Sequence, residues 1–512
     1  MKTHRILRFP IPIALASLLC GLTTMAGQEP GRGQRARLTD VSAPAIDRGL
    51  RDADPPVAPR SIGHDRIDRS ARRQDPYLRG SLIVKFKSGV SASDRVRALS
   101  TIDGSPTSSP PYADFDIVTI APDADPEAAA RELSARPDVE YAQARYRVHP
   151  TFVPNDPLYS RQWNFPALDM ERAWDINPGA SSDVIVAVID SGVAYGNAMV
   201  RFTGIAVRGL PALGPVDVPF AAAPELGGPQ RFVAPRDFIW NDATPFDLDG
   251  HGTHVAGTIG QVTNNGIGVA GMAFNVRIMP IKVIDTDWDE IFDSPGIGTD
   301  DVVARGIRYA VDNGARVLNL SFGRGGFPAP VVRGAVEYAV SHGAFVVVAA
   351  GNEFESGNTP NRVADFARQI DGMVAVGATG RTGGRAYYSN TGPYIELMAP
   401  GGDGRRNGTS GGILQQTLDQ NVVDRYSSGP ARFGPPRFDM FVYDFYQGTS
   451  MAAPHVAGFA ALLMQQGITS PAAIEAIMKR YATDLGAPGR DDENGDGLIN
   501  PRAALRGMGL VR

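Results

Sequence analysis

Four polar residues in the chain have side chains that together could carry out acyl transfer. Asp190 and Asn352 each follow an apolar run that predicts a buried strand, and His251 and Ser450 each begin a predicted helix. Unpaired N–H groups and the helix dipole favour negative charge at such a helix start. Taken singly, these residues could simply cap turns or helices. Taken together, they supply an orienting carboxylate, a base, a nucleophile and an amide donor for an oxyanion.

Two other patterns could suggest different chemistry. His251 and His254 lie three residues apart on one helix face and could bind a metal ion. No HExxH pattern and no obvious third ligand accompanies them, which argues against a metal site. A Gly-x-Ser-x-Gly pattern at Ser410 matches the nucleophile elbow of α/β-hydrolases, but a loop composition precedes it where a strand is required. Ser450 is therefore the better candidate nucleophile.

The composition excludes several classes of function. The 512 residues suggest about three structural units, and 43% apolar with 21% charged residues indicate a largely globular protein. A net charge of −5 gives no electrostatic signature of a nucleic-acid or anionic-membrane partner, so neither is expected. Cys20 is the single cysteine, which excludes disulfides and cysteine chemistry from the rest of the chain. Any nucleophile must then be an oxygen or a lysine.

The amino terminus has the pattern of a secretion signal. Three basic residues precede an apolar run over residues 9–22, and small residues with signal-peptidase spacing follow it. We interpret residues 1–26 as a cleaved signal peptide. A membrane anchor is the alternative, but two prolines interrupt the run and it is shorter than the about 20 residues that a spanning helix needs. Lipid attachment at Cys20 is a third option, although Leu19 is larger than the residue that lipoprotein signals prefer.

Three regions of different composition follow the signal. Residues 27–77 are rich in Arg and Pro without periodicity, which predicts a disordered linker. Residues 78–150 alternate predicted strands and helices, as a small α/β sandwich does. Residues 151–512 form a longer α/β series, which predicts a mostly parallel sheet flanked by helices on both faces. The expected strands are 81–87, 115–120, 139–148, 184–189, 278–284, 316–320, 345–349 and 373–376, and the helices of the sandwich are 91–100 and 126–135.

The candidate residues and the motifs around them resemble those of the subtilisin-like serine proteases, or subtilases. The family's chain order of Asp, His and Ser matches Asp190, His251 and Ser450. The segments that carry the resemblance are VAVIDSGV, HGTHVAGT, AAGN and GTSMAAPHVAG, and the similarity runs from about residue 155 to 505. It implies a three-layer catalytic domain in which Ser450 attacks a peptide carbonyl, His251 transfers the proton and Asp190 orients the imidazole. Asn352 and the Ser450 N–H would bind the oxyanion.

The resemblance also implies how a polypeptide substrate binds. The family's substrate-binding edge corresponds to Leu320, Ser321, Phe322 and Gly323, where a peptide adds as an extended strand through main-chain hydrogen bonds. Ala350 and Gly351 would wall the primary pocket. Backbone recognition implies broad specificity, and nothing near these residues in sequence supplies an obvious selective charge.

By the same resemblance, residues 78–150 are a propeptide that acts as an intramolecular chaperone and inhibitor. Its last strand would leave through the active site, which places autocleavage near residues 145–155. The expected product is a secreted, monomeric endopeptidase made as a zymogen.

Structural calcium is the one cofactor that the resemblance implies. Asn265 belongs to a loop similar to the family's calcium loop, but the usual His-Pro-Asp after the catalytic Asp is missing and an insertion runs over about 194–237. A second insertion spans about 402–446. Asp492, Asn494 and Asp496 match the first half of an EF-hand loop, although its position 12 is Ala and a simple Gly-rich turn would fit as well.

Two rival functions remain open from the sequence. A catalytically silent homologue could bind peptides through the same groove, although such proteins usually lack at least one triad residue. An esterase could use the same acyl-transfer machinery, and a comparison of amide with ester substrates would separate the two activities.

Overall fold

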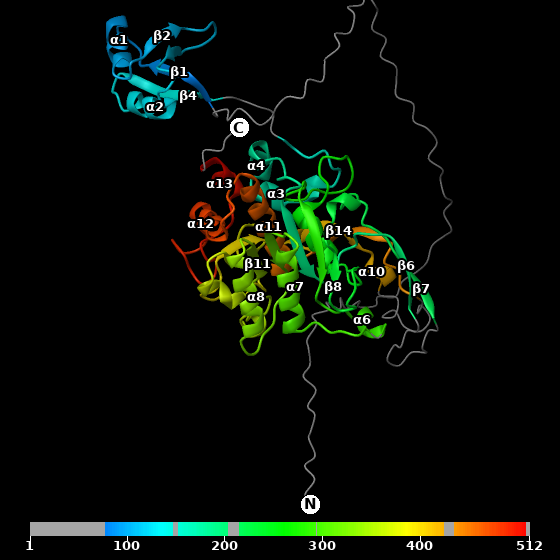
Figure 1. Ribbon diagram of the computed structural model, residues 1–512. Helices are drawn as coiled ribbons and strands as arrows, with labels where there is room; N and C mark the ends of the chain where they lie inside the picture. The colour runs from blue at the N-terminus through cyan, green and yellow to red at the C-terminus, as the bar shows by residue number, and fades with distance from the viewer. Residues whose placement is uncertain (1–76, 147–151, 203–214, 293, 424–434, 508–512) are drawn as a thin grey trace, which may run out of the picture. The chain divides into compact units, whose positions relative to one another are not determined.

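The computed structural model describes residues 77–146, 152–202, 215–292, 294–423 and 435–507 (Figure 1). The predicted signal peptide, the linker up to residue 76 and residues 147–151 of the predicted cleavage segment lie outside the described residues. No described helix is both long enough and apolar enough to cross a membrane.

The amino-terminal region is a four-stranded antiparallel sheet with two helices. Its strand order is β2-β3-β1-β4. Alternate residues of β1, such as Leu82 and Val84, are fully buried and pack with Leu99 and Leu133 from the helices. The elements are β1 (Tyr77–Phe86), α1 (Ala92–Ser100), β2 (Ser105–Ser108), β3 (Asp116–Thr119), α2 (Pro126–Ser134) and β4 (Val139–Tyr146). Sequence patterning missed β2, which is short and mostly polar.

The larger region is built on a seven-stranded sheet in which every recorded pairing is parallel. Its order is β13-β12-β11-β10-β5-β9-β8. Most of its strand residues are buried, because helices cover both faces of a parallel sheet, and the sequence shows them as continuous apolar runs. The strands are β5 (Ile185–Asp190), β8 (Arg236–Asp237), β9 (Arg277–Lys282), β10 (Val317–Leu320), β11 (Phe345–Ala349), β12 (Met373–Thr379) and β13 (Leu397–Pro400).

Two helical layers cover this sheet, so the predicted three-layer architecture is confirmed. In β5, Val186 and Val188 belong to the core shared with α5 and α11, while Ala187 and Ile189 belong to the core shared with α7 and α8. The helices are α3 (Asn164–Ala167), α4 (Met170–Ile176), α5 (His251–Gly260), α6 (Asp287–Ile291), α7 (Asp300–Asp312), α8 (Pro330–Ser341), α9 (Gly404–Asn407), α10 (Gln420–Val423), α11 (Thr449–Gln465), α12 (Pro471–Tyr481) and α13 (Pro501–Gly507).

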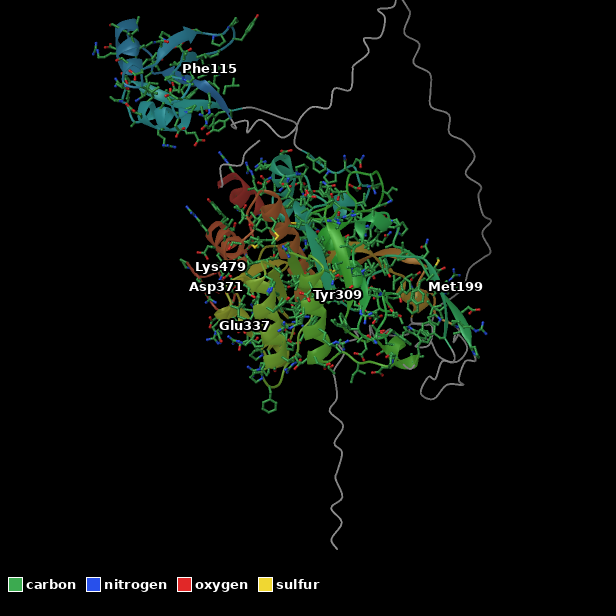
Figure 2. All side chains as sticks on the ribbon, viewed as in Figure 1. Phe115, Met199, Tyr309, Glu337, Asp371 and Lys479 are labelled. Carbon is green, nitrogen blue, oxygen red and sulfur yellow. The ribbon has the colours of Figure 1, made fainter. Side chains whose placement is uncertain are left out.

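Both predicted insertions contain a β-hairpin, and the two pack together. The first has β6 (Ala198–Phe202) and β7 (Val216–Phe220), and the second has β14 (Ile413–Leu418) and β15 (Phe441–Tyr446). The rings of Phe220 and Phe438 stack with centroids 5.0 Å apart inside a shared aromatic cluster. Met199 on β6 is exposed to solvent (Figure 2). β14 contacts α5, which begins with His251, so the second insertion supports the helix that carries the predicted base.

Candidate active site

Asp190 and His251 form a hydrogen-bonded pair at the carboxyl end of the sheet. Asp190 is the last residue of β5 and is fully buried, and its Oδ1 lies 2.7 Å from Nδ1 of His251, the first residue of α5. The carboxylate only accepts, so Nδ1 carries the proton and Nε2 is left as the basic nitrogen. This close approach needs a glycine after the histidine, because a Cβ on Gly252 would lie 2.0 Å from the Gly192 carbonyl oxygen.

Carboxylates control the proton affinity of this histidine. Burial alone would lower the pKa of His251, but the charge and hydrogen bond of Asp190 and the charges of Asp249 and Asp247 outweigh it. The result is a pKa of about 9. The imidazolium that forms during proton transfer is therefore well stabilised.

A buried carboxylate that the sequence reasoning missed ties the two catalytic segments together. Asp247 accepts hydrogen bonds from the Ser191 hydroxyl at 3.1 Å and from the N–H groups of Gly250 and Thr253 at 2.9 Å. The Ser191 hydroxyl in turn accepts the Gly252 N–H at 3.0 Å. Since the N-cap residue of α5 is a glycine without a capping side chain, Asp247 and Ser191 satisfy the free N–H groups of this helix start instead.

Ser450 is the second residue of α11, and its position depends on a proline. Pro454 has no N–H, so the Ser450 carbonyl lacks its normal helical donor four residues on. The Ser321 hydroxyl replaces that donor at 2.7 Å, and the Ser450 hydroxyl donates to the Ser321 carbonyl at 2.9 Å. Among the hydrogen bonds of the described residues, none joins Ser450 to His251. A side-chain rotation must bring the hydroxyl to Nε2, as is common before substrate binds.

Asn352 is oriented so that its amide can donate. Its Oδ1 accepts the Thr449 N–H at 2.9 Å and the Thr449 hydroxyl at 3.0 Å, which leaves the NH₂ group free for another acceptor. A Cβ built on Gly448 would lie 3.6 Å from both the Asn352 Nδ2 and the Ser450 backbone nitrogen. Both donors therefore border one space, where an oxyanion would be held.

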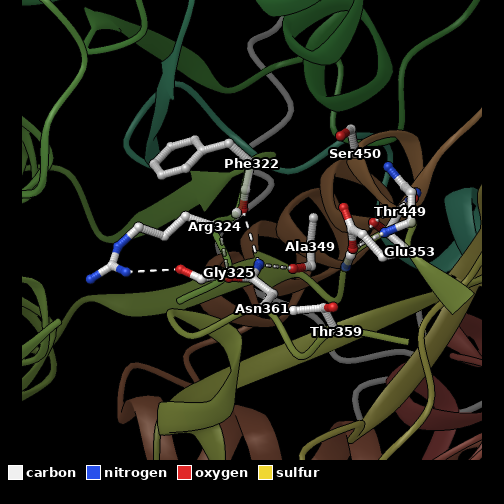
Figure 3. A pocket seen from close by; sticks show the side chains of 12 residues that line it. Phe322, Arg324, Gly325, Ala349, Glu353, Thr359, Asn361, Thr449 and Ser450 are labelled. Atoms are coloured by element: carbon white, nitrogen blue, oxygen red, sulfur yellow. Dashed lines mark hydrogen bonds between the residues drawn. The ribbon is translucent and has the colours of Figure 1, made fainter. Parts of the chain in front are cut away.

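A cavity of about 430 Å³ opens beside Ser450 and Asn352 (Figure 3). Of the predicted substrate-binding residues, Phe322, Gly323 and Gly351 line it. Leu320, Ser321 and Ala350 are buried behind the wall instead. The other lining residues are Arg324, Gly325, Ala349, Glu353, Thr359, Asn361 and Thr449.

The cavity carries charges that the sequence analysis did not anticipate, because Arg324 and Glu353 both line it. Arg324 is paired with Asp300 at 2.7 Å. The Glu353 carboxylate accepts the Asn352 N–H at 2.8 Å and an amide N–H of Asn390 at 3.0 Å. Both charged groups are thus held by hydrogen bonds at the rim.

His254 and Ser410 have no catalytic surroundings. His254 is fully buried, its Nε2 lies 3.0 Å from the Ile413 carbonyl oxygen, and burial lowers its pKa to about 3. Within the described part of the chain, no group of three or more His, Cys, Asp or Glu side chains could hold a metal ion. Ser410 is exposed in a short 3-10 turn, Thr409–Gly411, as its loop composition predicted.

The EF-hand-like segment forms a tight turn. The backbones of Asp491 and Gly495 pair with each other, and the Asp491 carboxylate accepts the Asn494 N–H at 2.7 Å. The Asn494 amide also donates toward Asp491, so it presents N–H groups rather than oxygen. Asp492 points to Arg490, and the predicted ligands Asp492, Asn494 and Asp496 do not form an oxygen cage. The structure therefore does not support a calcium site there.

The Asn265 loop has better surroundings for a cation. Asp156, which is buried, accepts the N–H groups of Asn264 at 2.7 Å and Asn265 at 3.3 Å. Glu225, from the first insertion, is also buried and accepts the Val269 N–H at 3.2 Å. Burial and the charge of Asp156 raise the pKa of Glu225. Each carboxylate accepts hydrogen bonds, but neither forms an ion pair with a Lys or Arg of the described residues, so both keep an uncompensated charge that suits a hard cation.

Comparisons with known proteins find a matching family and several relatives. The subtilase family pattern matches residues 181–497, and the fervidolysin N-terminal prodomain pattern matches residues 67–144. A thermophilic serine proteinase of a Bacillus species is 33% identical over 80% of this chain and 83% of its own length. An extracellular protease of Xanthomonas campestris is 32% identical over 75% of this chain and 62% of its length. A solved protease structure from Pseudoalteromonas arctica, 29% identical, superposes with a TM-score of 0.51 over 70% of this chain and 99% of its own.

Proposed function

This chain belongs to the subtilase family of serine proteases, and we propose that it is a secreted endopeptidase made as an autoprocessed zymogen. The observation that carries the proposal is the Asp190–His251 hydrogen bond, together with a cavity lined by Ser450 and Asn352. The extracellular protease among its relatives and the basic, apolar amino-terminal sequence support secretion.

In the proposed reaction, Ser450 Oγ attacks the carbonyl carbon of the scissile peptide while His251 Nε2 takes its proton. The oxyanion accepts hydrogen bonds from the Asn352 amide and the Ser450 N–H. The C–N bond then breaks as His251 returns the proton to the leaving amine, which yields an acyl-enzyme on Ser450. Water, deprotonated by His251, releases the acid and restores the serine.

The cavity supports cleavage of many sequences. Much of its lining is backbone, Gly and small side chains, and the two charged residues are already hydrogen-bonded. We therefore propose broad specificity for polypeptides, recognised mainly through an extended backbone.

The prodomain match supports an inhibitory chaperone role for residues 78–150, with cleavage near residues 145–155. The later part of this cleavage segment is already attached to the catalytic domain. The Phe152 N–H donates to Asp175 at 2.8 Å, and the ring of Phe152 contacts Trp174 with centroids 5.9 Å apart. A new amino terminus upstream of Phe152 would therefore be anchored, and the mature enzyme is proposed to act as a monomer.

We also propose a structural calcium ion at the Asn265 loop, held by Asp156 and Glu225. Bound calcium would stabilise the native state by mass action. Scanning calorimetry of the inactive Ser450→Ala protein with calcium or with EDTA tests this, with Glu225→Gln as the variant. A calcium-dependent rise of the Tm in the Ser450→Ala protein that Glu225→Gln removes is expected, and an unchanged Tm would contradict it.

Secretion of wild type beside Ser450→Ala tests the main proposal, with Ser410→Ala as a matched serine control. The mass and amino-terminal sequence of each product are determined, and casein hydrolysis is measured on the same samples. Wild type and Ser410→Ala should be trimmed near residues 145–155 and digest casein, whereas Ser450→Ala should stay untrimmed and inert. A trimmed, active Ser450→Ala would refute the nucleophile. Folded but untrimmed, inactive proteins throughout would favour peptide binding without catalysis.

A further inference from the structure

An arginine outside the catalytic residues connects one wall of the cavity to the start of α7. Arg324 follows β10 and lines the cavity, and Asp300 is the first residue of α7. Arg324 Nε and Nη2 donate to the two oxygens of Asp300, both at 2.7 Å. Such a two-point contact fixes the orientation of the guanidinium as well as its position.

The Nη1 group of Arg324 is also occupied. Nη1 donates to the carbonyl oxygens of Gly325 at 3.0 Å and Phe327 at 2.8 Å. A guanidinium has five N–H groups, and four of them are now used within the protein. Arg324 is therefore built as a brace rather than as a free ligand for an acidic substrate. Its side chain and that of Asp300 are 34% and 35% exposed, so the pair is only partly screened by water.

The inner side of the same wall is fixed by Asn361. Its amide donates to the carbonyl oxygens of Phe322 at 3.2 Å and Ala349 at 2.7 Å, and its Oδ1 accepts the Arg324 N–H at 3.3 Å. A Cβ on Gly323 would lie 2.1 Å from this amide, which shows how tightly the wall packs against it. On the outer side, beyond Arg324, the wall continues through Gly325 and Gly326 to Phe327, which is 87% exposed. The outer half of this wall is held by the ion pair with Asp300 and by Arg362, whose backbone N–H and Nε donate to the carbonyl oxygens of Arg324 at 2.9 Å and Gly326 at 2.7 Å.

We propose that the Arg324–Asp300 pair determines specificity by limiting the size of the side chain that the cavity accepts. The proposal rests on the proposed peptidase function, since it concerns the residue on the acyl side of the scissile bond. Without the pair, segment 323–328 keeps only its hydrogen bonds to Arg362 on the outer side and can move outward more easily. Bulky side chains then gain access relative to small ones.

Peptide amides that differ only at this residue test the proposal, with Ala, Trp, Glu and Lys as the set. The enzymes are wild type, Arg324→Ala, Asp300→Ala and the double variant. Arg437→Ala is the matched control, because Arg437 makes a comparable two-point pair with Asp439 and does not line the cavity. We expect the Trp-to-Ala ratio of kcat/KM to rise about fivefold in both single variants and no further in the double variant.

The alternative hypothesis, that the cavity selects side chains by charge, predicts a different result. If the cavity reads charge, Asp300→Ala will favour the Glu peptide and Arg324→Ala the Lys peptide, with the Trp-to-Ala ratio unchanged, and the proposal is overturned. Amide hydrogen exchange of residues 323–328 in the Ser450→Ala background needs no turnover. The brace requires faster exchange in Arg324→Ala and Asp300→Ala but not in Arg437→Ala. If wild type cleaves no peptide, the peptidase proposal fails. Equal exchange rates in all variants would instead overturn the proposal that the Arg324–Asp300 pair braces this wall.

Discussion

Two histidines on one helix, three residues apart, have opposite proton affinities. His251 and His254 both lie in α5. For each of them, burial by itself acts to lower the pKa. His251 contacts the Asp190 carboxylate and reaches a pKa of about 9, whereas His254 contacts the Ile413 carbonyl and falls to about 3. A neutral dipole does not offset the cost of burying the charge, but a carboxylate does. The identity of the partner, and not burial, makes one histidine a base.

Replacing Asp190 by Asn should have the largest effect on this contrast. The amide can donate to Nδ1 and favour the wrong tautomer, so we expect kcat on a peptide amide to fall by about 10⁴-fold. Steady-state kinetics at pH 10, above the His251 pKa of about 9, with circular dichroism on the same sample would measure it. A folded Asp190→Asn variant with less than a tenfold loss would show that this carboxylate does not set the state of His251.

Asn352→Ala removes the oxyanion donor while leaving both histidine environments intact. We expect a loss of about 10²- to 10³-fold in kcat with little change in KM, since the amide acts mainly in the transition state. Asn352→Asp serves as a control of similar shape that keeps the contact with Thr449 but loses the donor. Near wild-type kcat in Asn352→Ala would mean that the oxyanion lies elsewhere.

The buried His254 should make stability depend on pH in the acid range. It is neutral in the folded protein and protonates with an ordinary pKa near 6.5 when unfolded, so its stabilising effect is full above pH 6.5 and is lost as pH falls toward 3. We expect His254 to reduce the free energy of unfolding by about 1.4 kcal/mol for each pH unit in this range. Urea unfolding of the Ser450→Ala protein between pH 6 and 4 measures the slope. His254→Gln, which keeps an N–H donor for Ile413, should lower it by that amount, and an equal slope would refute this assignment.

Asp249→Asn should give the smallest effect. Asp249 is exposed, and its Oδ1 accepts the backbone N–H of His251 at 3.0 Å. The amide oxygen of Asn can keep this hydrogen bond. Removing its charge lowers the pKa of His251, so the base is neutral at lower pH and the acid limb of kcat/KM should move toward lower pH. Profiles at two salt concentrations provide the control, because salt weakens the influence of an exposed charge. A shift toward higher pH would contradict the role of this carboxylate.

The sequence predicted those parts of the molecule that are encoded locally. The strands β5 and β11 contain unbroken apolar runs, and the catalytic candidates lie at or just after the ends of these runs or at helix starts. Asp247 and Arg324 could not be found in this way, because their partners Ser191 and Asp300 lie 56 and 24 residues away in sequence.

The carboxyl-terminal segment shows the limits of predicting calcium binding from sequence spacing. The spacing of Asp492, Asn494 and Asp496 fits a cation loop, but the preceding Asp491 takes the Asn494 N–H and closes a turn. At the other site, Glu225 comes from an insertion that hides its relation to Asn265 in the sequence. Spacing alone does not say whether an oxygen accepts a hydrogen bond from a nearby backbone N–H or is free to bind an ion.

The missing N–H of Pro454 couples the nucleophile to the folding of the whole domain. The first turn of α11 cannot satisfy the Ser450 carbonyl by itself, and the hydroxyl that does so belongs to Ser321 at the end of β10. Helix and sheet must therefore meet before the serine is fixed in place. A nascent or partly unfolded chain has no assembled nucleophile, so proteolytic activity arises only in molecules that have completed their fold.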